Sequence, residues 1–351
     1  MTSIERTNQL NVELFMLPHF DKLVYGLGIE STAHTFGASV VASTGKILAD
    51  VKSVYTPPEG SGIHPRESSR HHTDKAASVI REALKVAGVR ARELSFIAYS
   101  AGPGLGPCLR VGATVARALA SYLNIPLVPV NHAVGHIEVA AFECGFSDPL
   151  VLLVSGGHTL ISAHSKGRWR IFGETLDITI GQLLDQFGRA AGFGSPAGKR
   201  LEELAKSARR YINLPYTVKG NDVSFSGLLT AAKNLLSSGE SLNDLAYSIQ
   251  ETGFAMLCEV TERALAFTEK SELLVTGGVA ANRRFCEMLN AVASRHNARF
   301  GAVSTRYAGD CGAQIAWTGL LAFSAGVTVP VEKSIIRQSW RLDTVDTPWR
   351  S

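Results

Sequence analysis

The chain repeats one succession of strands and glycine turns, and this repeat limits the folds that are open to it. Residues 24–56 contain three apolar segments separated by glycine-containing turns, and residues 148–177 show the same arrangement. Alternating apolar residues between such turns predict antiparallel strands. Each set is followed by a sequence of helical character. A mostly apolar segment comes next, at 93–104 in the first repeat and at 272–278 in the second, and it is expected to form a buried strand that ends in glycines. The pattern predicts a duplicated α/β unit whose two lobes face each other across a cleft.

Length and composition agree with two lobes. A chain of 351 residues exceeds the size at which one core usually stops growing, about 250–300 residues. We expect an N-terminal extension at 1–23, a first lobe at 24–147 plus 307–351, and a second lobe at 148–306. The five cysteines form no C-x-x-C pair and no apolar run is long enough for a membrane span, which favours a cytoplasmic protein with reduced thiols. The net charge of +4 permits a polyanionic partner without requiring one.

Helices are predicted between the strands from apolar residues three and four positions apart. One is expected at 73–88, with Thr73 or Asp74 as its N-terminal cap and Gly88 as its end. Further helices are expected at 110–124, 181–192, 199–210, 226–237, 242–270 and 281–296.

Four glycine turns end strands, at 26–34, 101–112, 154–159 and 276–284. Glycine at a strand end lets backbone N–H groups approach a ligand closely. Any one of these turns alone is more typical of an ordinary hairpin, and none matches a P-loop or dinucleotide fingerprint. Four of them in a two-lobed repeat favour a phosphate-bearing nucleotide in the cleft.

Two histidines four residues apart, His132 and His136, lie in an otherwise apolar helical segment. This spacing places both imidazoles on one helix face, where they can chelate a divalent ion such as iron or zinc. Two packed histidines are the commoner explanation of the bare spacing. Zinc proteases need a glutamate directly after the first histidine, and Ala133 occupies that position. Asp310, just ahead of an apolar helix, is the candidate third ligand, although such an aspartate is more often a turn or cap residue.

Several longer strings point in one direction. They are GIESTA, HPRESSRHH, GPGLGPCLRVGATVARALA, VNHAVGHIE, VSGGHT, FGETLDITIGQLLDQFGR, LPYTVKGNDVSFSGLLTAA, GGVAANRR, GDCGAQIAW and RLDTVDTPW. From about residue 24 to residue 349 the chain resembles the tRNA N6-adenosine threonylcarbamoyltransferases, in the archaeal and eukaryotic branch that forms the catalytic subunit of the KEOPS complex. The resemblance implies the ribonuclease H-like fold of actin, sugar kinases and heat-shock chaperone ATPases, with two lobes and a central nucleotide cleft.

The resemblance also assigns residues. It implies that His132, His136 and Asp310 bind one divalent metal ion, Fe²⁺ in preference to Zn²⁺. It implies a loop for the ligand phosphates at Leu153, Val154, Ser155, Gly156 and Gly157. It implies contacts with the nucleoside of an adenine nucleotide, ATP or threonylcarbamoyl-AMP, at Asp185, Gly198, Glu202 and Asn282.

The activity implied is transfer of threonylcarbamoyl from threonylcarbamoyl-adenylate to the adenosine beside the anticodon, in tRNAs that read codons beginning with A. AMP is released, and because the tRNA amine is the nucleophile, no covalent catalytic residue is expected. The partners implied are tRNA, a small kinase-like ATPase and a small dimerising subunit of KEOPS, with no membrane. The basic residues Lys199, Arg200, Lys206, Arg209 and Arg210 are candidate tRNA contacts, or equally one face of a solvated helix.

Some positions depart from the family pattern. Leu153 stands where the branch usually has a tyrosine and so offers no metal ligand, and Ala197 replaces a glycine, so that its methyl group could crowd a ligand. Cys311 replaces an asparagine, and Gln182 and His158 also differ from the common residues.

Two other functions remain open at this stage. An ATP-driven chaperone or filament protein of the same superfamily would not need a His–His–Asp site. A sugar or acid kinase would need a carboxylate near the γ-phosphate, for which Glu30 or Asp185 could be proposed.

Overall fold

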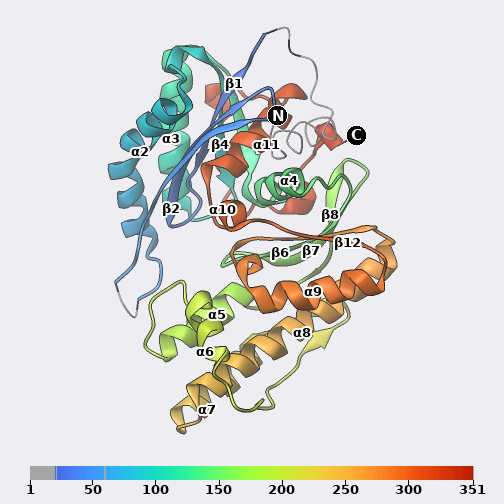
Figure 1. Cartoon of the computed structure of the whole chain (residues 1–351). Coiled ribbons are helices and arrows are strands. Elements are labelled where there is room, and N and C mark those ends of the chain that lie inside the picture. Colours follow the sequence, from blue (N-terminus) through green and yellow to red (C-terminus); the bar gives the residue numbers. More distant parts are fainter. Residues whose placement is uncertain (1–19, 21, 59–60, 351) are drawn as a thin grey trace.

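A first mixed sheet of five strands forms the upper half of the molecule in Figure 1. The computed structural model describes residues 20, 22–58 and 61–350, so the N-terminal extension expected at 1–23 lies almost entirely outside the described residues. The sheet has the order β3-β2-β1-β4-β5, with β1 to β3 antiparallel and β1, β4 and β5 parallel. Its strands are β1 (Tyr25–Glu30), β2 (Thr35–Ala42), β3 (Ile47–Val54), β4 (Leu94–Gly102) and β5 (Leu127–Asn131).

The second sheet repeats this topology in the lower half. Its order is β12-β11-β6-β7-β8, with β6 to β8 antiparallel and β6, β11 and β12 parallel. The strands are β6 (Leu150–Val154), β7 (Thr159–Ser165), β8 (Arg168–Glu174), β11 (Glu272–Thr276) and β12 (Arg299–Ala302). A two-stranded ribbon is added by β9 (Val218–Lys219) and β10 (Asp222–Val223). The predicted duplicated α/β unit is confirmed.

Helices surround both sheets. They are α2 (Pro65–Ala87), α3 (Gly106–Leu123), α4 (His132–Cys144), α5 (Ile180–Ala190), α6 (Gly198–Ala205), α7 (Ser226–Ser237), α8 (Leu242–Thr268), α9 (Arg283–Arg295), α10 (Thr305–Ala308) and α11 (Gly312–Ser324). Among the described residues, no helix combines the length and the hydropathy needed to cross a bilayer.

Three predicted helix boundaries are wrong by four residues or more. Helix α3 begins at Gly106 rather than at 110. Helix α2 begins at Pro65 rather than at Thr73, because a proline in the first turn needs no hydrogen-bond partner and has a helical φ. Its end is as predicted, with Gly88 in the left-handed region at φ 67°. Helix α6 ends at Ala205, ahead of the expected 210. The carboxylate of Asp244 accepts the Arg209 N–H at 2.6 Å, which holds that segment outside the helix.

The first sheet is covered on both faces, which explains why every residue of β2 is buried. Helix α2 packs on one face and α11 on the other, between the sheet and α4 (Figure 1). The approach of α11 is close: a Cβ added to Gly312 would lie 2.5 Å from the carbonyl carbon of Ala38. A Cβ on Gly28 would lie 2.2 Å from the backbone nitrogen of Ala316. Because these glycines have no side chain, α11 can lie directly against β1 and β2. This close packing determines the position of the loop before α11.

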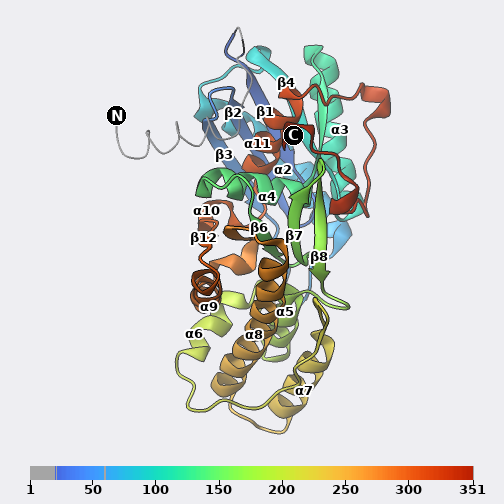
Figure 2. The ribbon, with the colours of Figure 1, turned by 90° about the vertical axis from the view of Figure 1, so that its right-hand side faces the viewer.

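The last residues of the described chain run beside β8 and reach the back of α4 (Figure 2). There the guanidinium of Arg350 donates to both carboxylate oxygens of Glu138, at 2.7 Å each. The Trp349 indole N–H donates to the same carboxylate at 3.1 Å. The side chains of Arg350 and Glu138 are 7% and 0% exposed. This buried pair joins the C-terminal segment to the helix that carries the two histidines.

Candidate metal centre and adjoining nucleotide site

Helix α4 lies between the two sheets, and almost all of its residues are buried, including the polar His132, His136 and Glu138. Its N-terminus is capped by Asn131, whose side-chain oxygen accepts the N–H groups of Ala133 and Val134 at 3.0 and 3.1 Å. His132 is therefore the first residue of the helix and His136 lies one turn further, on the same face. Their ring centres are 4.7 Å apart.

The two histidines converge on one carboxylate oxygen, as the sequence suggested. Nε2 of His132 lies 3.4 Å from Oδ1 of Asp310, and Nε2 of His136 lies 3.3 Å from the same atom. Among the described residues, these three form a group whose ligand atoms all lie within 4.8 Å of one another. Charge-assisted hydrogen bonds are usually shorter, about 2.7–2.9 Å. Two ligands held about 2.0–2.1 Å from one tetrahedral ion are separated by roughly 3.3–3.4 Å, so the donor set fits a divalent cation.

The loop that carries Asp310 is positioned from the first sheet. The carboxylate of Asp50, on β3, accepts the Ala313 N–H at 3.0 Å and thereby satisfies the first turn of α11. Burial raises the pKa of Asp50 despite this hydrogen bond. The contact of Gly312 with Ala38 holds the same turn against β2. Asp50 was not predicted from the sequence, because nothing in the local pattern connects it with residues more than 250 positions away.

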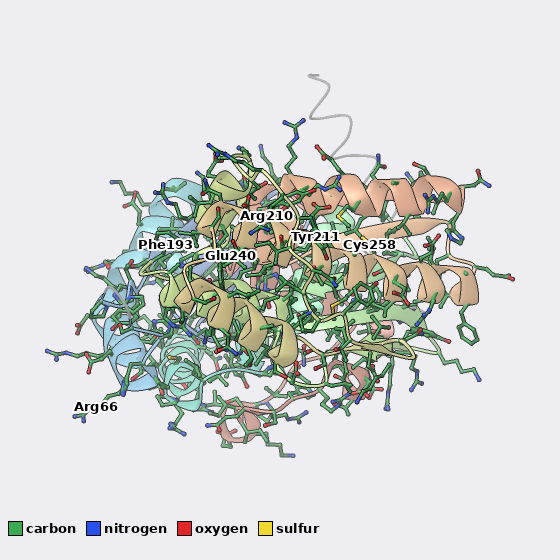
Figure 3. All side chains as sticks on the ribbon, turned by 90° about the horizontal axis from the view of Figure 1, so that it is seen from below. Arg66, Phe193, Arg210, Tyr211, Glu240 and Cys258 are labelled. Atoms are coloured by element: carbon green, nitrogen blue, oxygen red, sulfur yellow. The ribbon has the colours of Figure 1, made fainter. Side chains whose placement is uncertain are left out.

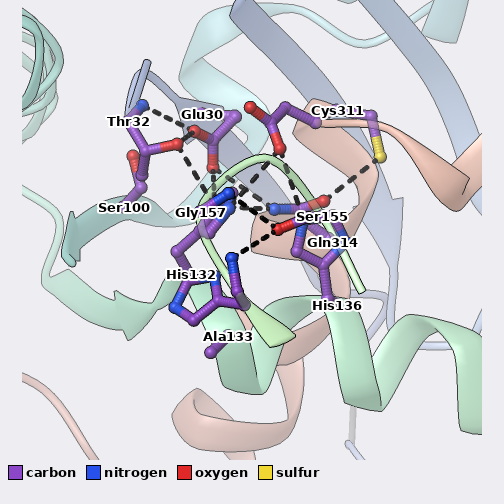
Figure 4. A network of polar contacts seen from close by, with 12 residues as sticks. Glu30, Thr32, Ser100, His132, Ala133, His136, Ser155, Gly157, Cys311 and Gln314 are labelled. Carbon is purple, nitrogen blue, oxygen red and sulfur yellow. Dashed lines mark hydrogen bonds and ion pairs between the residues drawn. The ribbon is translucent and has the colours of Figure 1, made fainter. Parts of the chain in front are cut away.

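Glu30, at the end of β1, orients the first histidine (Figure 4). Its Oε2 lies 3.1 Å from Nδ1 of His132, and because a carboxylate only accepts, the imidazole is the donor. Its other oxygen accepts the Thr32 N–H at 2.6 Å. The Gln314 amide nitrogen lies 2.9 Å from Nδ1 and donates to Oε2 of Glu30 at 3.4 Å. This arrangement directs the opposite nitrogen of His132 toward Asp310, in the way that carboxylates orient metal-binding histidines.

The hydrogen bonds of Glu30 argue against a kinase function for this site. Glu30 is fully buried and its oxygens are taken up by His132 and Thr32. It is therefore poorly placed to deprotonate a substrate hydroxyl, the role that a kinase would give it.

The carboxylates make the cluster attractive to positive charge. Burial by itself would lower the pKa of His132, but Glu30 and Asp310 outweigh it and raise that pKa to about 9. The pKa of His136 is lowered, chiefly by burial. Burial would raise the pKa of Asp310, yet the two histidines outweigh it and lower that pKa. Without an ion, the positive charge of a protonated His132 balances the carboxylates, and a cation can supply that charge instead.

The turn between β6 and β7, residues 155–158, adjoins this cluster. The Ser155 hydroxyl oxygen accepts the N–H groups of Gly157 and His158, at 3.2 and 3.0 Å. Gly156 and Gly157 are exposed, and a Cβ on either would meet open space. Leu153 and Val154 are wholly buried in β6, so the exposed part of the predicted phosphate loop is the glycine pair.

The residues predicted to touch the nucleoside join three helices of the second lobe. Asp185 on α5 accepts the Ala197 N–H at 2.8 Å, directly before Gly198. Glu202 on α6 accepts the Arg283 N–H at 2.9 Å, directly after Asn282. These contacts bring α5, α6 and the start of α9 together.

Asn282 is 5% exposed. Its side chain caps α9 by accepting the Phe285 N–H at 3.1 Å and donates to Gln250 at 2.6 Å. The roles of these residues toward a nucleotide remain predictions.

Ala197, the departure from a glycine, has its methyl group against helix α5. A Cβ on Gly188 would lie 2.2 Å from this methyl carbon, and Ala197 is 1% exposed. The methyl group therefore packs against Gly188 within the lobe.

The candidate tRNA contacts at 199–210 are partly neutralised by acidic neighbours. Lys206 pairs with Glu203 at 2.8 Å, and Arg210 pairs with Glu240 at 2.6 Å. Figure 3, a view from below, shows Arg210 beside Glu240. The stretch is thus a mixed-charge surface, which leaves both original interpretations open.

Comparison with known families gives one consistent match. A sequence profile of the family described as tRNA N6-adenosine threonylcarbamoyltransferase matches residues 46–317. Proteins of that name from Caldivirga maquilingensis and Thermofilum pendens are 51% and 52% identical, over 92% and 93% of this chain and 97% of each relative. A Methanothermobacter thermautotrophicus protein, described as a probable bifunctional tRNA threonylcarbamoyladenosine biosynthesis protein, is 50% identical over 92% of this chain and 60% of its own length.

Solved structures share the fold at low identity. HypF from T. kodakarensis matches with a TM-score of 0.61 and 16% identity, over 88% of this chain and 48% of its own. Component A of (R)-2-hydroxyglutaryl-CoA dehydratase from Acidaminococcus fermentans matches with a TM-score of 0.55 and 15% identity, over 86% of this chain and 99% of its own. These similarities confirm the predicted actin-like ATPase fold class.

Proposed function

This chain belongs to the tRNA N6-adenosine threonylcarbamoyltransferase family and is a tRNA-modifying transferase, and we propose on that premise that its donor substrate is threonylcarbamoyl-adenylate. The acceptor is N6 of the adenosine beside the anticodon in tRNAs that read codons beginning with A. The relatives carry this transferase name over nearly their whole length, so a chaperone or kinase function is not favoured.

One divalent ion, Fe²⁺ in preference to Zn²⁺, is proposed to bind His132, His136 and Asp310. The observation that carries this proposal is the convergence of two Nε2 atoms on one Asp310 oxygen, at 3.4 and 3.3 Å. Such an ion would withdraw charge from the carbamoyl carbonyl and stabilise negative charge on the leaving phosphate. Glu30 supports the site by keeping the Nδ1 proton of His132 in place.

The second lobe is proposed to hold the adenylate. The exposed glycines of the 155–158 turn offer backbone to the α-phosphate, without side chains in the way. Asp185, Gly198, Glu202 and Asn282 lie where α5, α6 and α9 meet, and we propose that this junction receives the adenine and ribose. The lobe thus orients the acyl adenylate toward the metal ligands of the first lobe, and positioning supplies part of the rate.

The transfer needs no covalent residue on the protein. The N6 amine of the adenosine attacks the carbamoyl carbon, a C–N bond forms, and the C–O bond to the adenylate phosphate breaks. AMP leaves with that electron pair, and the amine loses one proton. Among the described residues, the cysteines have thiols whose pKa is raised where a shift is resolved, mainly by burial. A raised pKa makes thiolate nucleophiles scarce.

Partner subunits of KEOPS are part of the proposal. The Methanothermobacter relative is described as bifunctional and extends well beyond the part that this chain matches. We propose that a kinase-like ATPase, a small dimerising subunit and tRNA assemble with this chain in the cytoplasm.

The test is mass spectrometry of nucleosides from tRNA incubated with the protein, its partners and the acyl adenylate, with metal content measured in parallel. Wild-type protein should form threonylcarbamoyladenosine and release AMP. His136→Ala and Asp310→Ala should lose both the metal and the product, whereas the exposed control Asp74→Ala should keep both. Full activity in the two metal-ligand variants would remove the ion from the mechanism, and ADP as the product would favour a kinase or chaperone.

A further inference from the structure

A third imidazole, that of His158, lies beside the metal ligands on a segment from the other lobe. His158 ends the 155–158 turn, and its backbone is fixed there: its carbonyl accepts the Ser155 N–H at 2.7 Å, and its own N–H donates to the Ser155 hydroxyl at 3.0 Å. Figure 4 draws Ser155 and Gly157 of this turn in the same view as His132. Because the turn is short and hydrogen-bonded, the position of the side chain at 158 is fixed by the fold.

The ring of His158 has a polar atom that the protein leaves without a partner. Its Nδ1 is buried and makes no hydrogen bond. Its ring centre is 6.1 Å from that of His132, with 30° between the ring planes. His132, His136 and Asp310 are the charged or ionisable groups that act on it. An unpartnered buried nitrogen is costly unless a ligand satisfies it, and the ionisable groups that act on this side chain are the proposed metal ligands.

The spacing of the rings allows a shared ion only after His158 moves inward. With a metal–nitrogen bond of about 2.0–2.1 Å, an imidazole centre lies roughly 3.2 Å from the ion, and two such centres at a tetrahedral angle lie roughly 5.2 Å apart. The ring centres of His132 and His136, at 4.7 Å, are a little closer than this. The ring centres of His132 and His158, at 6.1 Å, are about 1 Å further apart than this. The group whose ligand atoms lie within 4.8 Å of one another comprises only the first three residues, so the His158 side chain must move inward to reach an ion.

We propose that His158 is a fourth protein ligand of this metal ion, contributed by the turn that holds the donor phosphate. The inference rests on the metal site proposed above and extends it across the two lobes. The first lobe contributes His132, His136 and Asp310, and the second lobe contributes His158. Metal binding then draws the exposed Gly156–Gly157 pair toward the first lobe, which aligns the phosphate loop with the ion. Three imidazoles and one carboxylate suit a borderline cation such as Zn²⁺, Fe²⁺ or Co²⁺.

Cobalt substitution tests this without relying on activity. The affinity for Co²⁺ is measured by competition with a chelator, and the visible absorption of bound Co²⁺ reports the ligand set. His158→Asn and His158→Gln should weaken binding about 10–100-fold, at least the loss that removing an outer-shell partner causes, and should change the spectrum. The matched control is His296→Asn, at a surface histidine that pairs with Glu262. It should leave both measurements unchanged.

The outcomes separate this inference from the proposed metal site. His132→Ala should abolish Co²⁺ binding. If it does so while both His158 variants keep wild-type affinity and spectrum, His158 is not a ligand and the inference is wrong. Weaker binding with an unchanged spectrum would also overturn direct coordination. If His132→Ala itself binds Co²⁺ normally, the metal site fails, and the inference fails with it. Circular dichroism of the metal-free variants checks that the fold is intact.

Discussion

Glu30 accepts a hydrogen bond from Nδ1 of His132 at 3.1 Å, and this contact joins the end of one strand to the first residue of α4, the helix that carries two proposed metal ligands. Because Nδ1 carries the proton, Nε2 is free to face Asp310. Glu30, which the sequence marked only within the GIESTA string and as a candidate kinase carboxylate, therefore controls the tautomer and the direction of a proposed ligand.

We expect Glu30→Gln to weaken metal binding about 10–100-fold, the range seen when a second-shell carboxylate is lost. The amide has the same shape but no charge, so the pKa of His132 should fall from its raised value as well. Competition with a chelator measures the first effect, and NMR titration of the metal-free protein measures the second. Glu67→Gln, at an exposed position of α2, is the control. Equal metal affinity in the two variants would show that Glu30 does not orient the site.

Gly312→Ala should displace the loop of Asp310. The added methyl group would meet the backbone of Ala38 at 2.5 Å, so helix α11 must move away from β2. Overpacking of this kind costs about 1–3 kcal/mol, and we expect metal affinity to fall together with stability. Gly309→Ala is the matched control, because Gly309 also neighbours Asp310 but an added Cβ would meet nothing within 4 Å. Thermal unfolding and metal competition on the pair should differ sharply; similar losses in both variants would contradict this explanation.

His72 should make the protein sensitive to mild acid. Burial, followed by the neighbouring His71, lowers the pKa of His72 to about 4, against an ordinary value of 6.5. The unfolded chain therefore binds the proton first, so the stability contribution is complete above pH 6.5 and is lost as the pH falls toward 4. His72→Leu should remove up to about 3 kcal/mol of this pH dependence. Urea unfolding at pH 7 and pH 4.5 measures it, and an unchanged slope with pH in the variant would exclude His72 as the source.

Removing only Arg350 from the buried pair of Glu138 and Arg350 should destabilise the protein more than removing both charges. Arg350→Leu leaves a buried carboxylate without its cation, which costs about 3–5 kcal/mol. Adding Glu138→Gln removes that charge and keeps an acceptor for Trp349, so the double variant should be more stable than Arg350→Leu alone. Urea unfolding of the single and double variants gives the comparison. A double variant that loses the sum of both single losses would argue against a buried charge as the cause.

Much of the fold could be predicted because it depends on local periodicity. The hairpin strands β1 to β3 and β6 to β8 follow alternating apolar residues, and the repeated order of the two sheets follows from the repeated pattern. The start of α2 could not be predicted from apolar spacing, since its first turn is polar. Pro65 at its first position was the available signal.

The site was predictable only in part. His132 and His136 share a helix face, so their spacing was informative, and Asp310 was a candidate from its place ahead of an apolar helix that the family resemblance then supported. Asp50 and Gln314 act through contacts between segments more than 180 residues apart, and sequence periodicity contains no information about such contacts. His158 was visible only as a departure from the family pattern, and its closeness to His132 required the fold.

Asp310 follows His136 by 174 positions, and this separation has a consequence for synthesis of the chain. At about 5–20 residues per second, the ribosome needs roughly 10–35 s to add these 174 residues after the histidines have been made. During that interval the imidazoles lack their carboxylate. Binding of the proposed ion by all three ligands therefore requires that the entire second sheet has already been translated.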